Sequence, residues 1–406
     1  MLKYLRKKIV ELFNVYTHEF YITFHDGGIL LFFLFLPFVY PVLYSLIYNP
    51  ELVRDVKMVV VDEDCTSTSR ELVRRIDACQ EAWVTGYAAN LDEARKAMDS
   101  HHCYGILQIP KGFERSIGRL EQANAILYCD MSLLLRYKGF LVAATNVMMD
   151  MGGEITTERI DEIAPLAETV VSGDLMPISN RTLGNVEGGF DSFIMPGIVV
   201  LILHQCLILA TCMAGGAKRE KPSIIGYHAI NQEPSTLMSL LGQMLCYMTI
   251  IFVPTIFLYH YIPQIFAFPM EGNPIEMLAF LLPMVIGALS IGFIIQGLVG
   301  QRESVFVFWV VTSVVFLFLS GLTWPRYAMP GFWKVLSDLI PATWGVEGFI
   351  RMNTNGASLS QVSSEYINLW IIGAVYFAIA YCMQRWVLRP KLHLSFGKFF
   401  PKASKP

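Results

Sequence analysis

Six long and strongly apolar windows constrain this sequence more than any other feature, and none of them holds an aspartate or a glutamate. A helix needs roughly 20 apolar residues to cross a hydrocarbon core of about 30 Å. Only 16% of the 406 residues are charged, against about 25% in a soluble domain. The windows predict an α-helical integral membrane protein with six transmembrane helices. They lie at 28–48, 192–213, 237–259, 277–299, 305–323 and 367–387.

About 140 residues of charged sequence separate the first window from the second, a length that suits a small domain. Strand-like runs such as VKMVVVDED and YGILQIP alternate there with helical runs such as TSTSRELVRRIDACQ. This alternation indicates an inserted α/β extracytoplasmic domain with a small parallel sheet, followed by a longer helix near 132–150. The predicted domains are an amphipathic interfacial helix at 1–26, a first transmembrane helix at 27–48, a periplasmic α/β domain at 49–190, a five-helix transmembrane bundle at 191–388 and a basic cytoplasmic tail at 389–406.

Lysine and arginine set the expected orientation, because short cytoplasmic segments carry an excess of both. With the N-terminus inside, the outside short segments hold only Arg326, Lys334 and Arg351, and the inside segments hold many more basic residues. We therefore expect both termini to be cytoplasmic and the large domain to be external. About 25 polar residues precede the first window, which favours a signal anchor over a cleaved signal peptide.

Four of the eight cysteines, Cys65, Cys79, Cys103 and Cys129, fall in the predicted external domain, where disulfides persist. In a parallel sheet, Cys65 and Cys129 lie at the carboxyl edge, and Cys79 and Cys103 at the opposite edge. A six-residue strand separates these edges by about 20 Å, whereas a disulfide spans a Cα separation of only about 4.4–6.8 Å. Two alternatives remain: the pairs 65–129 and 79–103, or free thiols.

Two ways of energising transport are absent from the sequence. The windows lack acidic residues, which disfavours an ion-coupled carrier. The chain also has no G-x-x-x-x-G-K-[ST] phosphate loop. The side chains of His204 and Gln205, midway along the second window, fit either hydrogen bonding within a helix bundle or a substrate pathway. A metal site at the neighbouring His101, His102 and Cys103 is disfavoured because adjacent side chains at a helix end diverge, and neither a metal nor a cofactor is predicted.

Two predicted cytoplasmic segments have the character of contact surfaces. Residues 2–24 have apolar residues at helical spacing with lysine and arginine between them, typical of a helix that lies among lipid headgroups. The segment 214–236 carries Arg219, Glu220 and Lys221 between the second and third windows. It is either a solvated loop or the place where an ATPase couples to the chain.

The stretch GLTWPRYAMPGFWKVLSDLIPAT, at 321–343, follows the fifth window and is interrupted by prolines. Pro325 and Pro330 are expected to stop the span, and Pro341 to end the short helix between them. Freed backbone groups cannot face lipid, so this helix lies against protein or water. Trp324 and Trp333 suit the membrane interface. The segment 324–345 is therefore predicted to be either a re-entrant external lid or a plain interfacial turn.

The layout as a whole resembles the permease subunits of type-2 ABC exporters, in particular the bacterial branch that works with a periplasmic adaptor and an outer-membrane duct. The resemblance covers essentially the whole chain. Its most specific residues are Gly321, Trp324-Pro325, Met329-Pro330, Trp333, Leu339-Ile340-Pro341-Ala342-Thr343, Glu347-Gly348 and Gly356, with Glu19, Asp26 and Pro37 near the N-terminus.

This resemblance implies a permease without its own ATPase motifs, placed among the lipids of the bacterial inner membrane. Its implied partners are an ABC ATPase subunit, a second permease (a homodimer or a sister permease), the adaptor and the duct, and no nucleic acid. The alternative function is a membrane receptor or sensor whose external α/β domain binds a ligand. A membrane hydrolase is disfavoured because no carboxylate in the windows can serve His204.

Overall fold

The computed structural model describes residues 2–48, 53–119, 121–163, 185, 189–220, 235–298 and 303–388, and the chain divides into two compact units. The first, here called the helical unit, comprises Met1–Asn49 and Thr182–Pro406. The second, here called the sheet unit, comprises Pro50–Arg181. In sequence, the sheet unit therefore follows the first apolar helix. Each unit has its own buried apolar core.

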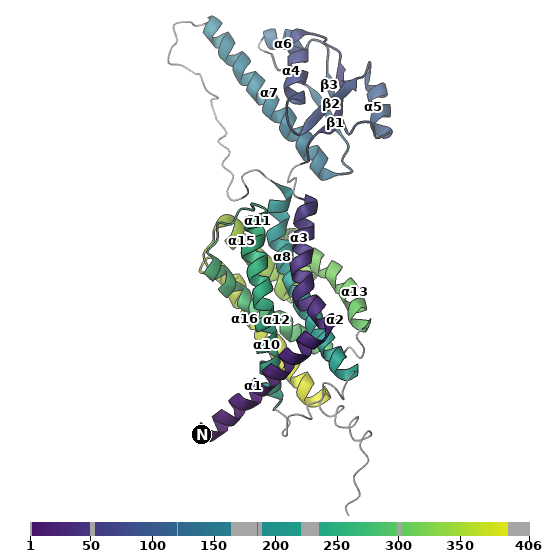
Figure 1. Cartoon of the computed structure of the whole chain (residues 1–406). Coiled ribbons are helices and arrows are strands. Elements are labelled where there is room, and N and C mark those ends of the chain that lie inside the picture. The colour runs from purple at the N-terminus through teal and green to yellow at the C-terminus, as the bar shows by residue number, and fades with distance from the viewer. Residues whose placement is uncertain are drawn as a thin grey trace, which may run out of the picture. The chain divides into compact units, whose positions relative to one another are not determined.

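The helical unit is a bundle of long helices joined by short ones (Figure 1). Its elements are α1 (Leu2–His25), α2 (Gly27–Leu30), η1 (Leu31–Phe35), α3 (Leu36–Tyr48), α8 (Phe190–Glu220), α10 (Thr236–Ile256), η3 (Phe257–Tyr261), α11 (Ile262–Ile265), α12 (Pro274–Leu298), α13 (Glu303–Leu319), η4 (Arg326–Ala328), α14 (Gly331–Asp338), α15 (Pro341–Asn355), α16 (Ser363–Met383) and η5 (Gln384–Leu388).

Five helical segments in the described part of the chain are long and apolar enough to cross a membrane. They are Gly27–Tyr48, Phe190–Lys218, Thr236–Ile265, Pro274–Leu298 and Ser363–Trp386. The remaining predicted span corresponds to α13, a helix of 17 residues, which at 1.5 Å per residue is about 25 Å long. The prediction of six spans thus corresponds to five full-length helices and one shorter apolar helix.

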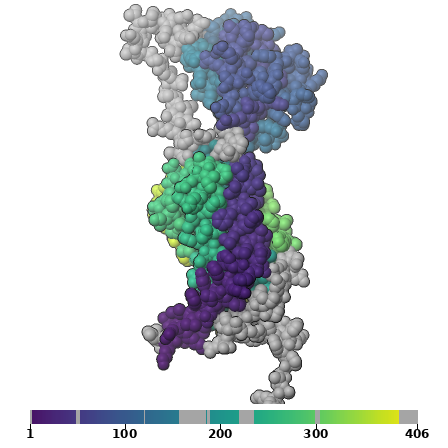
Figure 2. Space-filling model, viewed as in Figure 1, coloured from purple at the N-terminus to yellow at the C-terminus, as the bar shows by residue number. Residues whose placement is uncertain are grey.

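The N-terminal helix α1 ends where Asp26 caps the next helical segment. The Asp26 carboxylate accepts hydrogen bonds from the backbone N–H groups of Gly28 and Ile29, at 3.1 and 3.3 Å, which satisfies two donors at the start of α2. The helix α1 packs closely on α10, because Gly242 has no side chain and Val15 fills the space. Figure 2 shows α1 and its continuation (purple) on the surface of the helical unit.

Helix α8 forms the centre of the helical unit, because nearly all of its apolar side chains are buried. It packs against α12, α15, α3 and α13. Small residues permit the close approach to α12: a Cβ at Gly292 would meet Thr211 at 2.7 Å, and Gly215 leaves room for the Gln296 side chain. Small residues at such crossings are typical of helix packing in membranes, where dispersion contacts replace the hydrophobic effect.

The sheet unit contains a four-stranded sheet with strand order β2-β1-β3-β4. Helices α4, α6 and α7 contribute to the larger apolar core, and α5 packs with Val59, Val61 and Ile106 in a second cluster. The elements are β1 (Val56–Asp62), α4 (Ser67–Asp77), β2 (Ala82–Tyr87), α5 (Leu91–Asp99), β3 (Gly105–Ile109), α6 (Phe113–Gly118), β4 (Ile126–Cys129) and α7 (Leu134–Ile163).

The prediction of a wholly parallel sheet is wrong for the last strand. Strand β1 pairs in parallel with β2 and β3, but β4 pairs antiparallel with β3, and Cys129 lies opposite Gly105. Cys129 therefore lies at the same sheet edge as Cys103, and Cys65 follows the carboxyl end of β1 at the other edge. All four cysteines are free thiols. The basis for the pair 65–129 is therefore wrong, since Cys65 and Cys129 lie at opposite edges of the sheet. The pair 79–103 and the free-thiol alternative stay predictions.

Candidate functional site

A buried carboxylate joins three helices at one end of the helical unit. Glu19 of α1 is 1% exposed, and its carboxylate accepts hydrogen bonds from the Lys218 ammonium and, at 3.0 Å, from the Tyr247 hydroxyl. Lys218 lies near the C-terminal end of α8, and Tyr247 lies on α10. An unpaired charge in such surroundings would cost several kcal/mol, so the two donors are what permit the burial of Glu19. We call these three residues the Glu19 junction.

The Glu19 junction lies one residue before the predicted coupling residues. Helix α8 continues through Ala214 to Glu220, so the first part of the predicted segment 214–236 is helical, and α10 begins at Thr236. Arg219 and Glu220 belong to the last turn of α8, but their side chains, and Lys221 as a whole, lie outside the described residues. Movement at this end of α8 is therefore linked to α1 and α10 through Glu19.

His204 and Gln205 lie in the middle of α8, and the structure separates their environments. His204 is completely buried, and neither of its ring nitrogens has a hydrogen-bonding partner among the described residues. The ring of Phe316 on α13 lies edge-on to it, with the centroids 5.5 Å apart. Gln205 is partly buried, and its buried amide nitrogen also lacks a partner there. The expected hydrogen bonds between helices are thus not formed by these two side chains in the described residues.

The proline-interrupted segment after α13 contains η4, α14 and the start of α15, and each proline precedes or begins one of these elements. Pro325 precedes η4 and Pro330 precedes α14. The prediction that Pro341 ends the short helix is wrong: α14 ends at Asp338, and Pro341 occupies the first position of α15. Proline is favoured there because its missing N–H would have no partner in the helix. Trp324 and Trp333 are half exposed, at 56% and 48%.

Two side-chain hydroxyls of this segment form hydrogen bonds with a backbone carbonyl at the end of α13. The Ser337 hydroxyl donates to the Leu319 carbonyl at 2.7 Å, and the Thr343 hydroxyl lies 3.4 Å from the same oxygen. Gly321 has a φ of +85°, a conformation that favours glycine, and it turns the chain back. These hydrogen bonds therefore hold α14 and the start of α15 against the end of α13.

Arg326 is the central residue of this segment. Its guanidinium forms ion pairs with Asp338 at the end of α14 and with Glu347 on α15. The same group stacks over the Trp344 ring, 4.2 Å from its centroid. An arginine can hold two carboxylates and an aromatic face at once because its guanidinium is planar. Sequence reasoning counted Arg326 only as a charge for orientation and missed this role, although a lone arginine beside an apolar span was the available signal.

The structure also places acidic residues at the ends of the spanning helices, beyond the windows read from the sequence. Asp191 is fully buried in the first turn of α8. Glu365, buried in the first turn of α16, pairs with Arg351 at 2.5 Å. Glu276 of α12 accepts the backbone N–H of Leu359 at 2.6 Å. Carboxylates at helix N-termini are stabilised by the helix dipole, so a structural role accounts for these positions.

The sheet unit carries a groove of about 270 Å³ between α4, α6 and α7. Its lining is mainly apolar, and Glu121 is its ionisable member. In the described part of the chain, no group of three or more histidine, cysteine, aspartate or glutamate residues could hold a metal ion. The lining residues are Leu72, Phe113, Ile117, Glu121, Ala123, Met148, Met151, Gly152 and Ile155.

Comparison with known proteins identifies the kind of protein to which these features belong. A profile of the ABC-2 family transporter proteins matches residues 28–382. The linearmycin resistance permease protein LnrN of Bacillus subtilis (strain 168) is 18% identical over 338 residues, which cover 80% of this chain and 86% of that protein. Because the family profile spans most of the sequence, the chain belongs to the ABC-2 transporter family, whose members of this kind are transport permeases.

Proposed function

We propose that this chain is the membrane-spanning permease subunit of an ATP-driven exporter, energised by a separate ATPase subunit. It works as a dimer, with a second copy or a sister permease, in the bacterial inner membrane, with both termini in the cytoplasm. The sheet unit then faces the periplasm, where it meets an adaptor that leads to an outer-membrane duct. Rocking of the two bundles about their interface moves the cargo.

The Glu19 junction is the observation that carries this proposal. A permease without a phosphate loop needs a rigid path from an external ATPase into its helices. Glu19 ties α1 and α10 to α8 at Lys218, which lies within the segment 214–236 and directly precedes Arg219. A push on that segment by a closing ATPase would therefore be transmitted to three helices together.

The Arg326 pairs support a lid at the external end of the pathway. Asp338 and Glu347 bind Arg326 from two different helices, so α14 and α15 move as one piece while these pairs persist. The residues of the proposed lid are Trp324, Pro325, Pro330, Trp333 and Pro341, within 324–345. The ring nitrogens of His204, buried midway along α8, have no hydrogen-bonding partner among the described residues, which supports a place for His204 and Gln205 beside the pathway.

The name of the Bacillus subtilis relative bears on the cargo. That protein is a linearmycin resistance permease, and by analogy we propose that this chain exports a compound whose removal confers resistance on the cell. Growth of a deletion strain against a panel of membrane-active compounds, with the chain restored from a plasmid, tests the assignment.

Charge reversal in the coupling segment tests the proposed function. We expect Arg219→Glu with Lys221→Glu to reduce copurification of the ATPase and to abolish efflux, because both positions lie where α8 passes into that segment. Lys334→Glu on α14 is the matched control for the ATPase pull-down, since Lys334 is exposed in the segment proposed to be external. Normal ATPase pull-down and efflux in the double variant would contradict the proposal.

A second candidate function is a receptor or sensor, and the groove of the sheet unit favours it. The groove has a mainly apolar lining, and its volume of about 270 Å³ lies just below the size range of small-molecule sites, which begins at about 300 Å³. Copurification separates the two candidates: an ATPase that stays bound to the chain through purification indicates an exporter.

A further inference from the structure

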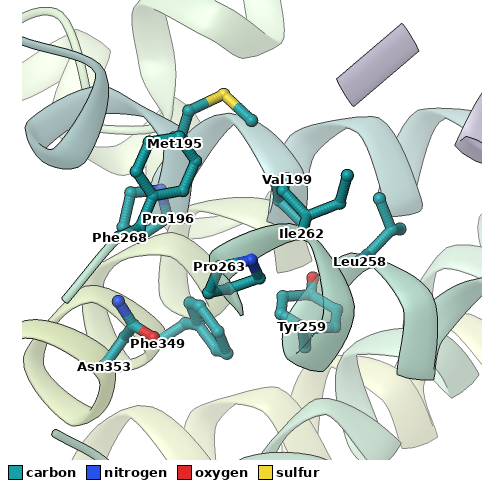
Figure 3. Close-up of a pocket in the computed structure, with 10 residues that line it drawn as sticks. All are labelled: Met195, Pro196, Val199, Leu258, Tyr259, Ile262, Pro263, Phe268, Phe349 and Asn353. Atoms are coloured by element: carbon teal, nitrogen blue, oxygen red, sulfur yellow. The ribbon is translucent and has the colours of Figure 1, made fainter. Parts of the chain in front are cut away.

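The pocket inside the helical unit is too small for an organic ligand. Figure 3 shows this pocket, which is formed by side chains of α8, of the η3–α11 stretch and of α15. It encloses about 20 Å³, enough for a single water molecule. The buried hydroxyl of Tyr259, which has no hydrogen-bonding partner among the described residues, can bind such a water. The surface of the same unit, in contrast, carries a helix end that is largely uncovered in the described part of the chain.

The first turns of α1 project away from the other helices of this unit, at the end marked N in Figure 1. The Glu11 carboxylate interacts with the backbone N–H of Ser235, the N-cap residue of α10. Before Glu11, every side chain from Lys3 to Val10 is exposed except that of Lys8. Helices in proteins obtain most of their stability from the packing of an apolar face. This end of α1 is therefore suited to a surface outside the chain.

Two exposed stripes of different chemistry run along this end of α1. One is apolar and 56–61% exposed, and its residues are Leu5, Ile9 and Phe13. The other is cationic, and its residues are Lys3, Arg6 and Lys7. Because an α-helix turns about 100° per residue, the two stripes lie roughly a third of a turn apart. Val15 and Glu19, which pack into the bundle, lie on a third face. We call the exposed pair the apolar stripe and the basic stripe.

The basic stripe lacks acidic partners within the described part of the chain, since none of its three side chains forms an ion pair there. Lys8, by contrast, pairs with Glu11 at 2.7 Å. The basic stripe therefore fits a partner that carries negative charge, and the apolar stripe beside it fits hydrocarbon. An anionic bilayer surface offers both, with phosphate groups directly above the acyl chains. Each Lys or Arg beside such a surface strengthens attachment about fivefold.

The helix α1 also contacts both ends of the segment 214–236. Glu19 binds Lys218 at the C-terminal end of α8. About two turns earlier in α1, the pKa of Glu11 is lowered by its pair with Lys8 and by the backbone N–H of Ser235, where α10 begins. One helix thus connects the end of α8 with the start of α10. A surface that holds α1 in place therefore also holds the two ends of this segment relative to each other.

We propose that the apolar and basic stripes of α1 form a docking surface for anionic phospholipids, and that this docking fixes the two ends of the segment 214–236 for the ATPase. The lipid is a condition for coupling and is not cargo. The docking itself concerns this chain alone, whereas its effect on the ATPase rests on the proposed function. The two parts are therefore tested by separate measurements.

Hydrogen exchange of the purified full-length chain in nanodiscs tests the docking. One bilayer is phosphatidylcholine, and the other is an equal mixture of phosphatidylcholine and phosphatidylglycerol. We expect peptides from residues 2–10 to exchange about tenfold more slowly in the mixed bilayer, and peptides from α12 to exchange equally in both. Salt at about 1 M, which reduces the Debye length to about 3 Å, should remove the difference.

Neutral variants separate the two stripes. We expect no response to phosphatidylglycerol when all three basic residues are replaced, by Lys3→Gln, Arg6→Gln and Lys7→Gln. The matched control removes three exposed cations of the sheet unit and should keep the full response; its changes are Lys96→Gln, Lys111→Gln and Arg119→Gln. Ile9→Ser in the apolar stripe should speed the exchange of residues 2–10 in both bilayers, because insertion into hydrocarbon is weakened. The elution volume on size exclusion shows that each variant is folded.

Equal exchange of residues 2–10 in the two bilayers would overturn the docking surface. A triple glutamine variant that still responds to phosphatidylglycerol would overturn it as well, because the basic stripe would not be what the lipid contacts.

ATP hydrolysis by the chain with its copurified ATPase, in the same two bilayers, tests the effect on coupling. We expect phosphatidylglycerol to stimulate hydrolysis in the wild type and in the sheet-unit control, but not in the triple glutamine variant. Slowed exchange without any stimulation would refute the role in coupling and leave the docking surface standing. Failure of any ATPase to copurify would count against the proposed function, and the exchange measurements would still decide the docking.

Discussion

At the scale of single residues, the most informative feature is how buried or anchored carboxylates obtain their partners. Glu19 has a cation and a hydroxyl from two other helices. Asp64, in the sheet unit, accepts the backbone N–H groups of Gly112 and Glu114, at 2.6 and 2.9 Å, and the Thr66 hydroxyl at 2.9 Å. Both carboxylates join elements that are far apart in sequence, so each is a sensitive position for substitution.

The Glu19 junction predicts strong coupling between its members. Lys218→Met leaves the buried Glu19 carboxylate without its cation, and we expect a loss of roughly 3 kcal/mol in the free energy of unfolding. Adding Glu19→Gln should restore part of that loss, because the unpaired charge is then removed. Thermal unfolding of both variants in detergent measures the difference. A double variant that is no more stable than Lys218→Met would contradict the pairing.

Asp64 predicts acid sensitivity of the sheet unit. The backbone N–H of Glu114, followed by that of Gly112 and the Thr66 hydroxyl, lowers the pKa of Asp64 below its usual value. The stability that Asp64 contributes is therefore present above about pH 4 and is lost as the pH falls through the lowered pKa.

Asp64→Asn should cost roughly 1–3 kcal/mol at pH 7 and should make stability depend less on pH below 4. Hydrogen exchange of peptides from β1 and β3 in the full chain, compared at pH 7 and at about pH 2, measures both effects. Asp92→Asn on the exposed face of α5 is the control. Equal exchange in wild type and Asp64→Asn at both pH values would refute this role.

At the scale of elements, helices pack closely where a glycine on one helix makes room for a large side chain on the next. A Cβ at Gly348 of α15 would collide with the Phe280 ring of α12, whereas a Cβ at Gly331 of α14 would meet nothing within 4 Å. Overpacking a filled core costs about 1–3 kcal/mol. Matched alanine substitutions at these two glycines therefore compare a filled interface with an open one.

Gly348→Ala should lower the unfolding temperature and the yield of folded protein, and Gly331→Ala should leave both unchanged. Phe280→Leu combined with Gly348→Ala should recover part of the loss, because the smaller side chain makes room for the added methyl group. Fluorescence-detected size exclusion after heating measures all three variants. A Gly348→Ala chain as stable as the wild type would show that the two helices can separate without cost.

Much of the secondary structure was predictable, because the spacing of apolar residues reflects which side of a helix or strand is buried. A helix that is buried or faces lipid on all sides is apolar throughout. Strand direction was not: the run at 126–129 looks the same in a parallel and an antiparallel pair, so the reversal of β4 could not be seen. Likewise, Pro341 suits both the end of one helix and the start of the next. In the candidate site, Glu19 and Lys218 are 199 residues apart, and no local pattern joins them.

At the scale of the whole molecule, the two units differ in composition and therefore in the surroundings that suit them. The helical unit contains the five segments of the described chain that are long and apolar enough to cross a membrane. The sheet unit is a charged domain with a four-stranded sheet and four free thiols. Because the sheet unit follows the first apolar helix in sequence, the proposed orientation places it on the opposite side of the membrane from α1.

Reaction of cysteines with an impermeant maleimide tests that orientation in spheroplasts. Cys65 is exposed, whereas burial raises the pKa of Cys79 and Cys103 and raises that of Cys129 to about 11. Because the thiolate is the reactive form, we expect Cys65 to react first in intact spheroplasts, and Cys65→Ser to remove this fast phase. A cysteine introduced at the exposed Lys7 of α1 should react only after permeabilisation. Labelling of Lys7→Cys without permeabilisation would place the N-terminus outside and reverse the proposed topology.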